Sequence, residues 1–136
     1  SDVFCVEAHR DSFLDLIKDN IDIVFCNEDE LNTLTKQNSA EESVKFVNKY
    51  FPNLDQLICT LGPKGVLVIK DQTEYFYEAT EAEVVDKTGA GDYFAAGYLY
   101  GIENDHSIED AALIANKSAA HVISEIGVRP EKPFSL

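Results

Sequence analysis

Residues 84–97 read VVDKTGAGDYFAAG, and this stretch decides the fold. The valines predict a short strand over residues 83–85, Gly89, Ala90 and Gly91 form a small-residue turn, and a helix follows over about residues 91–101. Backbone amides at the start of a helix have no carbonyl partner within it, and the helix dipole adds partial positive charge there. Because small residues let a phosphate approach these amides, the pattern is typical of an anion site.

Asp92 falls in the first turn of this expected helix, where a carboxylate is favourable. Beside a bound phosphate, it is placed to accept a proton from a substrate hydroxyl. Phosphoryl transfer has a loose transition state in most analyses, so an ionised aspartate that orients the nucleophile is sufficient. A turn whose aspartate only stabilises the helix end explains the same residues equally well, because a lone Gly-x-Gly is a weak signal.

Helix and strand patterns alternate along the rest of the chain. Further helices are expected over residues 9–18, 27–34, 39–50 and 107–124, the third and fourth of these beginning with capping patterns. Further strands are expected over residues 21–26 and 56–60, and a hairpin is expected to pair residues 66–69 with 74–77. This alternation predicts one compact unit over residues 1–136, an α/β sheet that is largely parallel with helices on its faces.

Composition excludes several partners. The 136 residues are 45% hydrophobic, which is enough to bury a core, and 25 acidic against 11 basic residues give a net charge of −14. This charge repels nucleic acid and anionic membranes. Cys5, Cys26 and Cys59 lack metal-binding spacing, and the latter two lie in strand-like runs where burial makes thiols inert. We therefore expect a cytoplasmic protein without a membrane span or nucleic-acid partner.

The segment from Asp86 to Asp92, DKTGAGD, closely resembles the second signature of the ribokinase-like carbohydrate and nucleoside kinases, usually Asp-Thr-Thr-Gly-Ala-Gly-Asp. The resemblance implies a three-layer α/β/α ribokinase-like, Rossmann-type fold. It also implies an anion hole made by the backbone of Gly89, Ala90 and Gly91, with Asp92 as the catalytic base. Lys87 stands where a small residue is usual, so the need for a monovalent cation such as potassium stays open.

An earlier segment, NEDE, resembles the Asn-x-x-Glu motif of the same family, which positions magnesium and the phosphates through water. The resemblance implies that Asn27 and Glu30 lie at the metal. Taken alone, the same two residues are better explained as an ordinary capping pattern at the start of a helix.

Two more segments resemble nucleotide-binding parts of the family. The run TLGPKG resembles its Thr-x-Gly-x-x-Gly turn and implies that Thr60, Gly62 and Gly65 lie along the nucleotide. The run NKSAA resembles the helix whose asparagine approaches the adenine, which implies this role for Asn116. An ordinary turn that needs glycine at positive φ, and a surface asparagine on an alanine-rich helix, are the alternatives.

The resemblance covers essentially the whole chain but only the later half of a family member. Residues 1–6, with His9 and Arg10, and residues 128–133 look closest to the adenosine-kinase-like branch. The expected activity of the full-length protein is therefore ATP- and Mg²⁺-dependent phosphorylation of a nucleoside or sugar, with adenosine as the first acceptor. In the family, the acceptor site and lid belong to the N-terminal half, so we expect this C-terminal fragment alone to be inactive. We also expect an uncovered sheet edge that favours a homodimer.

Two other functions fit the sequence less well. A non-catalytic nucleotide-binding or interaction module would keep the fold without turnover, but it has no need for Asp92 beside the phosphate. A nicotinamide-binding domain would need a Gly-x-Gly-x-x-Gly run and a ribose-binding acid about 20 residues later, and the chain lacks this combination.

Overall fold

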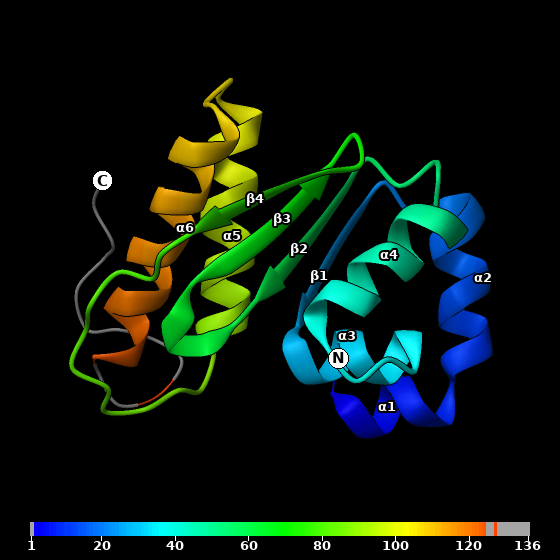
Figure 1. The fold of residues 1–136 in the computed structure, drawn as a ribbon. Helices are drawn as coiled ribbons and strands as arrows, with labels where there is room; N and C mark the ends of the chain where they lie inside the picture. Colours follow the sequence, from blue (N-terminus) through cyan, green and yellow to red (C-terminus); the bar gives the residue numbers. More distant parts are fainter. Residues whose placement is uncertain (1, 125–126, 128–136) are drawn as a thin grey trace. The chain divides into compact units, whose positions relative to one another are not determined.

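A computed structural model describes residues 2–124 and Gly127, and shows a mixed α/β fold (Figure 1). The chain divides into two compact units, the first made of Ser1–Leu61 and Leu67–Phe76 and the second of Gly62–Val66 and Tyr77–Leu136. The single domain expected over residues 1–136 stays a prediction, and residues 128–133 lie outside the described residues.

The first unit is built on a four-stranded sheet. Its strands follow the order β1 (Ile23–Asn27), β2 (Gln56–Thr60), β3 (Val66–Lys70) and β4 (Thr73–Tyr77). β1 and β2 are parallel, whereas β3 runs opposite to β2 and β4 reverses again (Figure 1). The expected hairpin is therefore confirmed, and β1 and β4 are the end strands of the sheet in the described part of the chain.

Helices of the first unit surround an apolar core. They are α1 (Val3–Ala8), α2 (Arg10–Asn20), α3 (Glu28–Thr35) and α4 (Ala40–Tyr50). Buried side chains from these helices pack with alternate residues of β2 and β3, among them Leu31, Val44, Leu57 and Leu67. The sequence pattern missed α1, a single short helix that begins where the Asp2 carboxylate accepts a hydrogen bond of 2.8 Å from the Cys5 amide.

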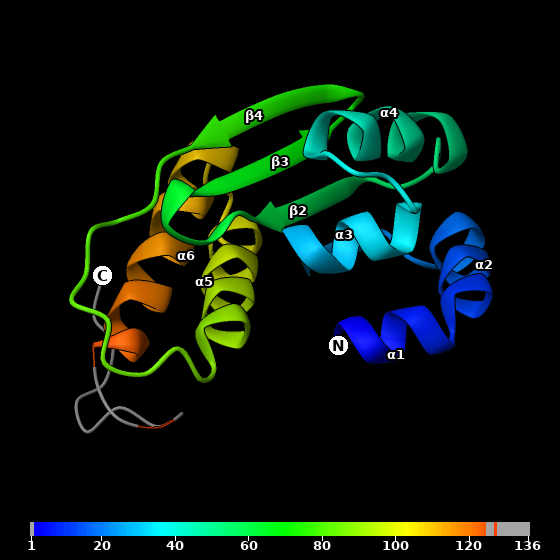
Figure 2. The same ribbon diagram turned by 60° about the horizontal axis from the view of Figure 1, so that its bottom comes forward.

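The second unit contains α5 (Ala90–Glu103) and α6 (Ile108–Ile123), which lie side by side in Figures 1 and 2. The two helices approach closely because small residues face each other. An added Cβ at Gly101 would lie 2.7 Å from Cα of Ala111, and one at Gly97 would lie 2.9 Å from Cα of Ala115. Ser107 caps α6, its hydroxyl accepting a 3.1 Å hydrogen bond from the Asp110 amide, as the capping pattern predicts.

The strand expected over residues 83–85 is wrong. This segment is irregular, and Val84 and Val85 are each 52% exposed. The amides of Val85 and Asp86 both donate to the carbonyl oxygen of Ile123, at 2.7 and 3.2 Å. A helix end therefore takes the hydrogen bonds that a neighbouring strand would have taken, and this contact overrides the strand preference of the valines.

Candidate phosphate and nucleotide site

The glycine-rich turn leads directly into α5. Gly89 is the N-cap at φ +83°, and its carbonyl accepts the first helical hydrogen bond, 3.0 Å from the Tyr93 amide. As a glycine, this N-cap residue supplies no side-chain cap. The amides of Gly91 and Asp92 have no carbonyl one turn earlier within the helix, and a Cβ added at Gly91 would meet nothing within 4 Å. The helix end thus offers donors and room for an anion.

Ala90 and Asp92 differ in what they contribute here. The Ala90 amide donates to the Lys87 carbonyl at 3.2 Å and closes the turn, so Ala90 supplies room rather than a donor. Asp92 is exposed in the first turn of α5, where its carboxylate is accessible to a substrate hydroxyl.

Asp86 stabilises the turn through three hydrogen bonds, and the sequence did not predict this role. One carboxylate oxygen accepts from the Thr88 amide at 2.9 Å and from its hydroxyl at 2.6 Å, and the other accepts from the Gly127 amide at 3.0 Å. These hydrogen bonds, the Thr88 hydroxyl first, lower the pKa of Asp86. An aspartate two residues ahead of a threonine is a local turn signal that points to the first two contacts but not to the third.

The Asp86 contacts should depend on pH. Because the folded-state pKa of Asp86 is lowered, its hydrogen bonds are complete above the ordinary aspartate pKa of about 3.9 and are lost as the pH falls through the lower folded-state value. We expect Thr88→Val to raise the pKa of Asp86 towards the ordinary value, and Thr80→Val to leave it unchanged. An NMR titration of the carboxyl carbons measures both. A wild-type Asp86 that titrates at or above 3.9 contradicts this account.

Asn27, Glu30 and Thr60 lie together in the first unit. Asn27 caps α3, with its Oδ1 2.9 Å from the Glu30 amide, and Glu30 Oε2 accepts from the Asn27 amide at 2.9 Å. Asn27 and Thr60 are register partners at the carboxyl ends of β1 and β2. Open α/β sheets bind ligands at such strand ends.

The capping box of Asn27 and Glu30 bears on their predicted metal role. The box is formed completely, and it uses the single side-chain oxygen of Asn27 and the Oε2 oxygen of Glu30. Within residues 2–124 and Gly127, no three His, Cys, Asp or Glu side chains gather in a way that would hold a metal ion. The donors present therefore suit Mg²⁺ held through water and ATP phosphates, since Mg²⁺ keeps several of its waters.

Gly62, Gly65 and Asn116 belong to the second unit. Gly62 has φ +60° and open space where a Cβ would stand. Gly65 is enclosed, because a Cβ would collide with the Tyr77 carbonyl oxygen and lie 2.9 Å from Glu78 Cα. Asn116 is 8% exposed and donates from Nδ2 to the Glu78 carbonyl at 2.9 Å, so it is not a surface asparagine.

The predicted site residues therefore form three groups. Asn27, Glu30 and Thr60 meet in the first unit. In the second unit, Gly65 and Asn116 meet at the segment that follows β4, and the turn with Asp92 forms the start of α5.

The cysteines were not predicted as site residues, but Cys26 precedes Asn27 and its carbonyl oxygen accepts from the Thr60 hydroxyl at 3.5 Å. Cys26 and Cys59 are register partners on β1 and β2, Cys59 is fully buried, and Cys5 is exposed. A hydrogen bond that the Cys26 thiol donates to Cys59, followed by burial, raises the pKa of Cys26. Burial is confirmed for Cys59, whereas Cys26 is half-buried.

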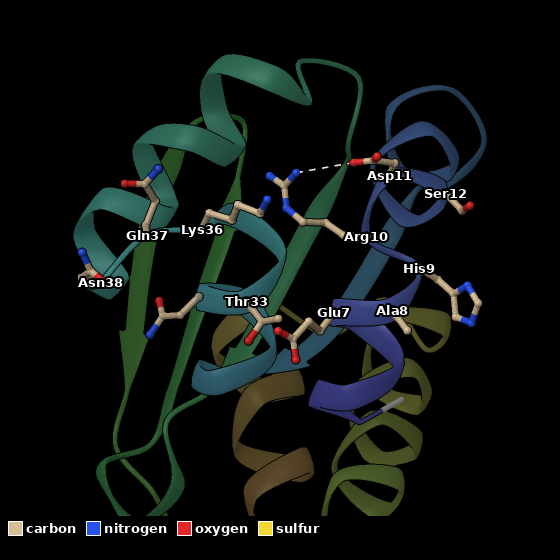
Figure 3. A pocket seen from close by; sticks show the side chains of 11 residues that line it. Glu7, Ala8, His9, Arg10, Asp11, Ser12, Thr33, Lys36, Gln37 and Asn38 are labelled. Atoms are coloured by element: carbon tan, nitrogen blue, oxygen red, sulfur yellow. Dashed lines mark ion pairs between the residues drawn. The ribbon is translucent and has the colours of Figure 1, made fainter.

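A polar hollow of about 620 Å³ lies elsewhere in the first unit (Figure 3). Its lining comes from the junction of α1 and α2 and from the end of α3. Arg10 crosses it and donates from Nε to the Leu34 carbonyl at 2.7 Å, so its cation stabilises the last turn of α3. None of the described residues predicted for the site lines this hollow. We assign the Arg10 side chain in it to capping of α3.

The glycine-rich turn, the start of α5 and Asp92 in its first turn follow one another as in the ribokinase-like signature that the sequence resembles. The chain matches the pfkB family of carbohydrate kinases over residues 3–134 and belongs to this family. It is 33% identical to a ribokinase from Lactococcus lactis over 124 residues, which cover 91% of the chain and 39% of that enzyme.

Solved structures agree with this assignment. A probable sugar kinase from Rhizobium etli is 37% identical with a TM-score of 0.89, and an adenosine kinase from Sinorhizobium meliloti is 34% identical with a TM-score of 0.90. Each comparison covers 97% of this chain and 40% of the other. The chain thus spans well under half the length of these relatives, and it has the predicted ribokinase-like fold.

A structure of Arabidopsis thaliana ribokinase complexed with ribose and ATP is 28% identical, with a TM-score of 0.75 over 84% of this chain. Within residues 2–124, no helix is long and apolar enough to cross a lipid bilayer.

Proposed function

We propose that the full-length protein transfers the γ-phosphoryl group of ATP to a hydroxyl group of a nucleoside or sugar, with adenosine as the first acceptor. The observation that carries the proposal is the start of α5, where free amides and the Asp92 carboxylate meet in a chain of the pfkB family. The ATP and ribose bound by a similar ribokinase support a nucleotide and a hydroxyl-bearing acceptor.

In the proposed reaction, Asp92 accepts the proton of the acceptor hydroxyl as its oxygen attacks the γ-phosphorus. The bond from this phosphorus to the bridging oxygen of ADP breaks, and ADP leaves with the bonding electrons. The amides of Gly91 and Asp92 donate to the oxygens of the transferring group, on which charge is concentrated. The room around Gly91 lets the phosphate approach these amides.

Magnesium enters the proposal with ATP, where it supplies positive charge to the phosphates. Asn27 Oδ1 and Glu30 Oε2 accept hydrogen bonds in the capping box, so these side chains would hold Mg²⁺ through its retained waters. Thr60, Gly62 and Gly65 would lie along the nucleotide. The need for potassium stays open, and a homodimer through an uncovered sheet edge stays a prediction.

The experiment is a panel of acceptors offered to the full-length protein with ATP and Mg²⁺. Adenosine, other nucleosides, ribose and fructose are compared by ADP release and by mass spectrometry of the product. We expect turnover on one of them, with adenosine favoured by the likeness to the Sinorhizobium meliloti adenosine kinase. ATP binding without turnover on any acceptor would replace the kinase by a non-catalytic nucleotide-binding module.

A further inference from the structure

Asn116 occupies an unusual place for a residue that contacts a ligand. Its side chain is buried in α6, and Nδ2 donates to the backbone carbonyl of Glu78, 38 residues earlier in the chain. The donor half of the amide is therefore used within the protein. A buried donor that lost this acceptor would be costly, so the contact holds both partners in place.

The segment that Asn116 holds is the one against which Gly65 packs. Gly65 has φ +129°, and the space for its Cβ is filled by the Tyr77 carbonyl oxygen, Glu78 Cα and Ala79 N. The Gly65 amide in turn donates to the Gly62 carbonyl at 3.2 Å, which closes the turn. A continuous set of contacts thus joins Asn116, through Glu78, to the Gly62 turn.

This turn has one closed side and one open side. Gly65 is buried against residues 77–79, whereas Gly62 is exposed and has open space around its Cβ position. A ligand can reach the turn only from the open side. The position of residues 77–79 therefore determines where the backbone of the open side lies relative to a ligand.

We propose that Asn116 is a positioning residue for the nucleotide, acting through the Glu78 carbonyl and Gly65 on the Gly62 turn rather than by touching the adenine. The inference rests on the proposed kinase function. It assigns Asn116 to the geometry of the turn, so its loss should weaken every purine nucleotide alike.

Direct contact with adenine makes a different prediction. With Nδ2 held by Glu78, only Oδ1 of Asn116 would remain to accept a hydrogen bond from the adenine 6-amino group. GTP carries a carbonyl oxygen at that position. A direct contact would therefore serve ATP only and would survive Asn116→Asp, whose carboxylate keeps this acceptor oxygen, whereas a displaced turn weakens ATP and GTP together.

The test compares Asn116→Asp with Ser118→Ala in the full-length protein. The first keeps the shape and replaces the donor by an acceptor, and the second alters another buried residue of α6, one that packs against Gly97. We expect Asn116→Asp to raise the KM for ATP and for GTP by the same factor, about tenfold for one lost hydrogen bond, with kcat unchanged. Ser118→Ala should leave both KM values unchanged.

A second readout needs no nucleotide. In Asn116→Asp, hydrogen exchange at the Gly65 amide should become faster, because its turn loses support. A KM that rises for ATP alone, or unchanged KM values, overturns the inference. Equal losses in Ser118→Ala overturn it as well, since they would show a general effect of disturbing α6. If the wild-type protein binds neither nucleotide, both the proposed function and this role of Asn116 are wrong. The exchange measurement then tests only whether Asn116 supports the turn.

Discussion

Asp92→Asn lowers kcat by at least about a hundredfold, with little change in the KM for ATP, if Asp92 is the general base. The amide has nearly the shape of the carboxylate but cannot accept the acceptor proton. The helix start keeps its backbone donors, because Gly91 and the amide of residue 92 are untouched. Steady-state kinetics with the acceptor found in the panel measure this effect.

Asp110→Asn is the matched control for this prediction. Asp110 also lies in the first turn of a helix, α6, where it accepts a 2.8 Å hydrogen bond from the Ser107 hydroxyl. Loss of a first-turn carboxylate there affects helix stability alone, so kcat should be unchanged. An Asp92→Asn protein that is folded and fully active would remove Asp92 from its proposed role. Equal losses in both variants would point to stability rather than catalysis.

Gly65→Ala should destabilise the protein by about 3 kcal/mol or more. The new methyl group would collide with the Tyr77 carbonyl oxygen and lie 3.0 Å from Ala79 N, both backbone atoms that cannot move away cheaply. The φ of +129° adds strain for any residue with a Cβ. Urea unfolding of the full-length protein measures the loss, and a variant that stays insoluble is counted as a loss of this size.

Gly62→Ala separates steric collision from backbone strain. Gly62 also has positive φ, at +60°, but open space around it. We expect this variant to lose only about 1 kcal/mol, the usual cost of a left-handed residue with a Cβ. Equal losses at the two glycines would mean that collision at Gly65 is relieved by movement of residues 77–79, which would weaken the positioning role of Asn116 as well.

The elements that sequence reasoning placed well depend on local chemistry. β2 begins and ends at the expected residues, and Ser39 and Ser107 are the N-caps of α4 and α6, as their capping patterns predict. The helix after Gly89 was expected because small residues precede an apolar run. Side chains two to four residues apart decide these features, so the order of residues is enough to find them.

The site was found by sequence only in part. The capping box of Asn27 and Glu30 is present, as their spacing in the sequence predicts. By contrast, Asp86 also accepts a hydrogen bond from the Gly127 amide, 41 residues away in the chain. No pattern of neighbouring residues predicts this contact.

By itself, the sequence determined the alternation of elements, the glycine turn at the start of α5 and the carboxylate beside it. The tertiary structure alone decided that the valines before the turn are irregular, since their amides meet the end of α6. It also decided that Asn116 is buried and holds Glu78. These features depend on partners far apart in the chain, and which distant groups meet is set by packing and by the need to satisfy buried donors, not by spacing along the chain.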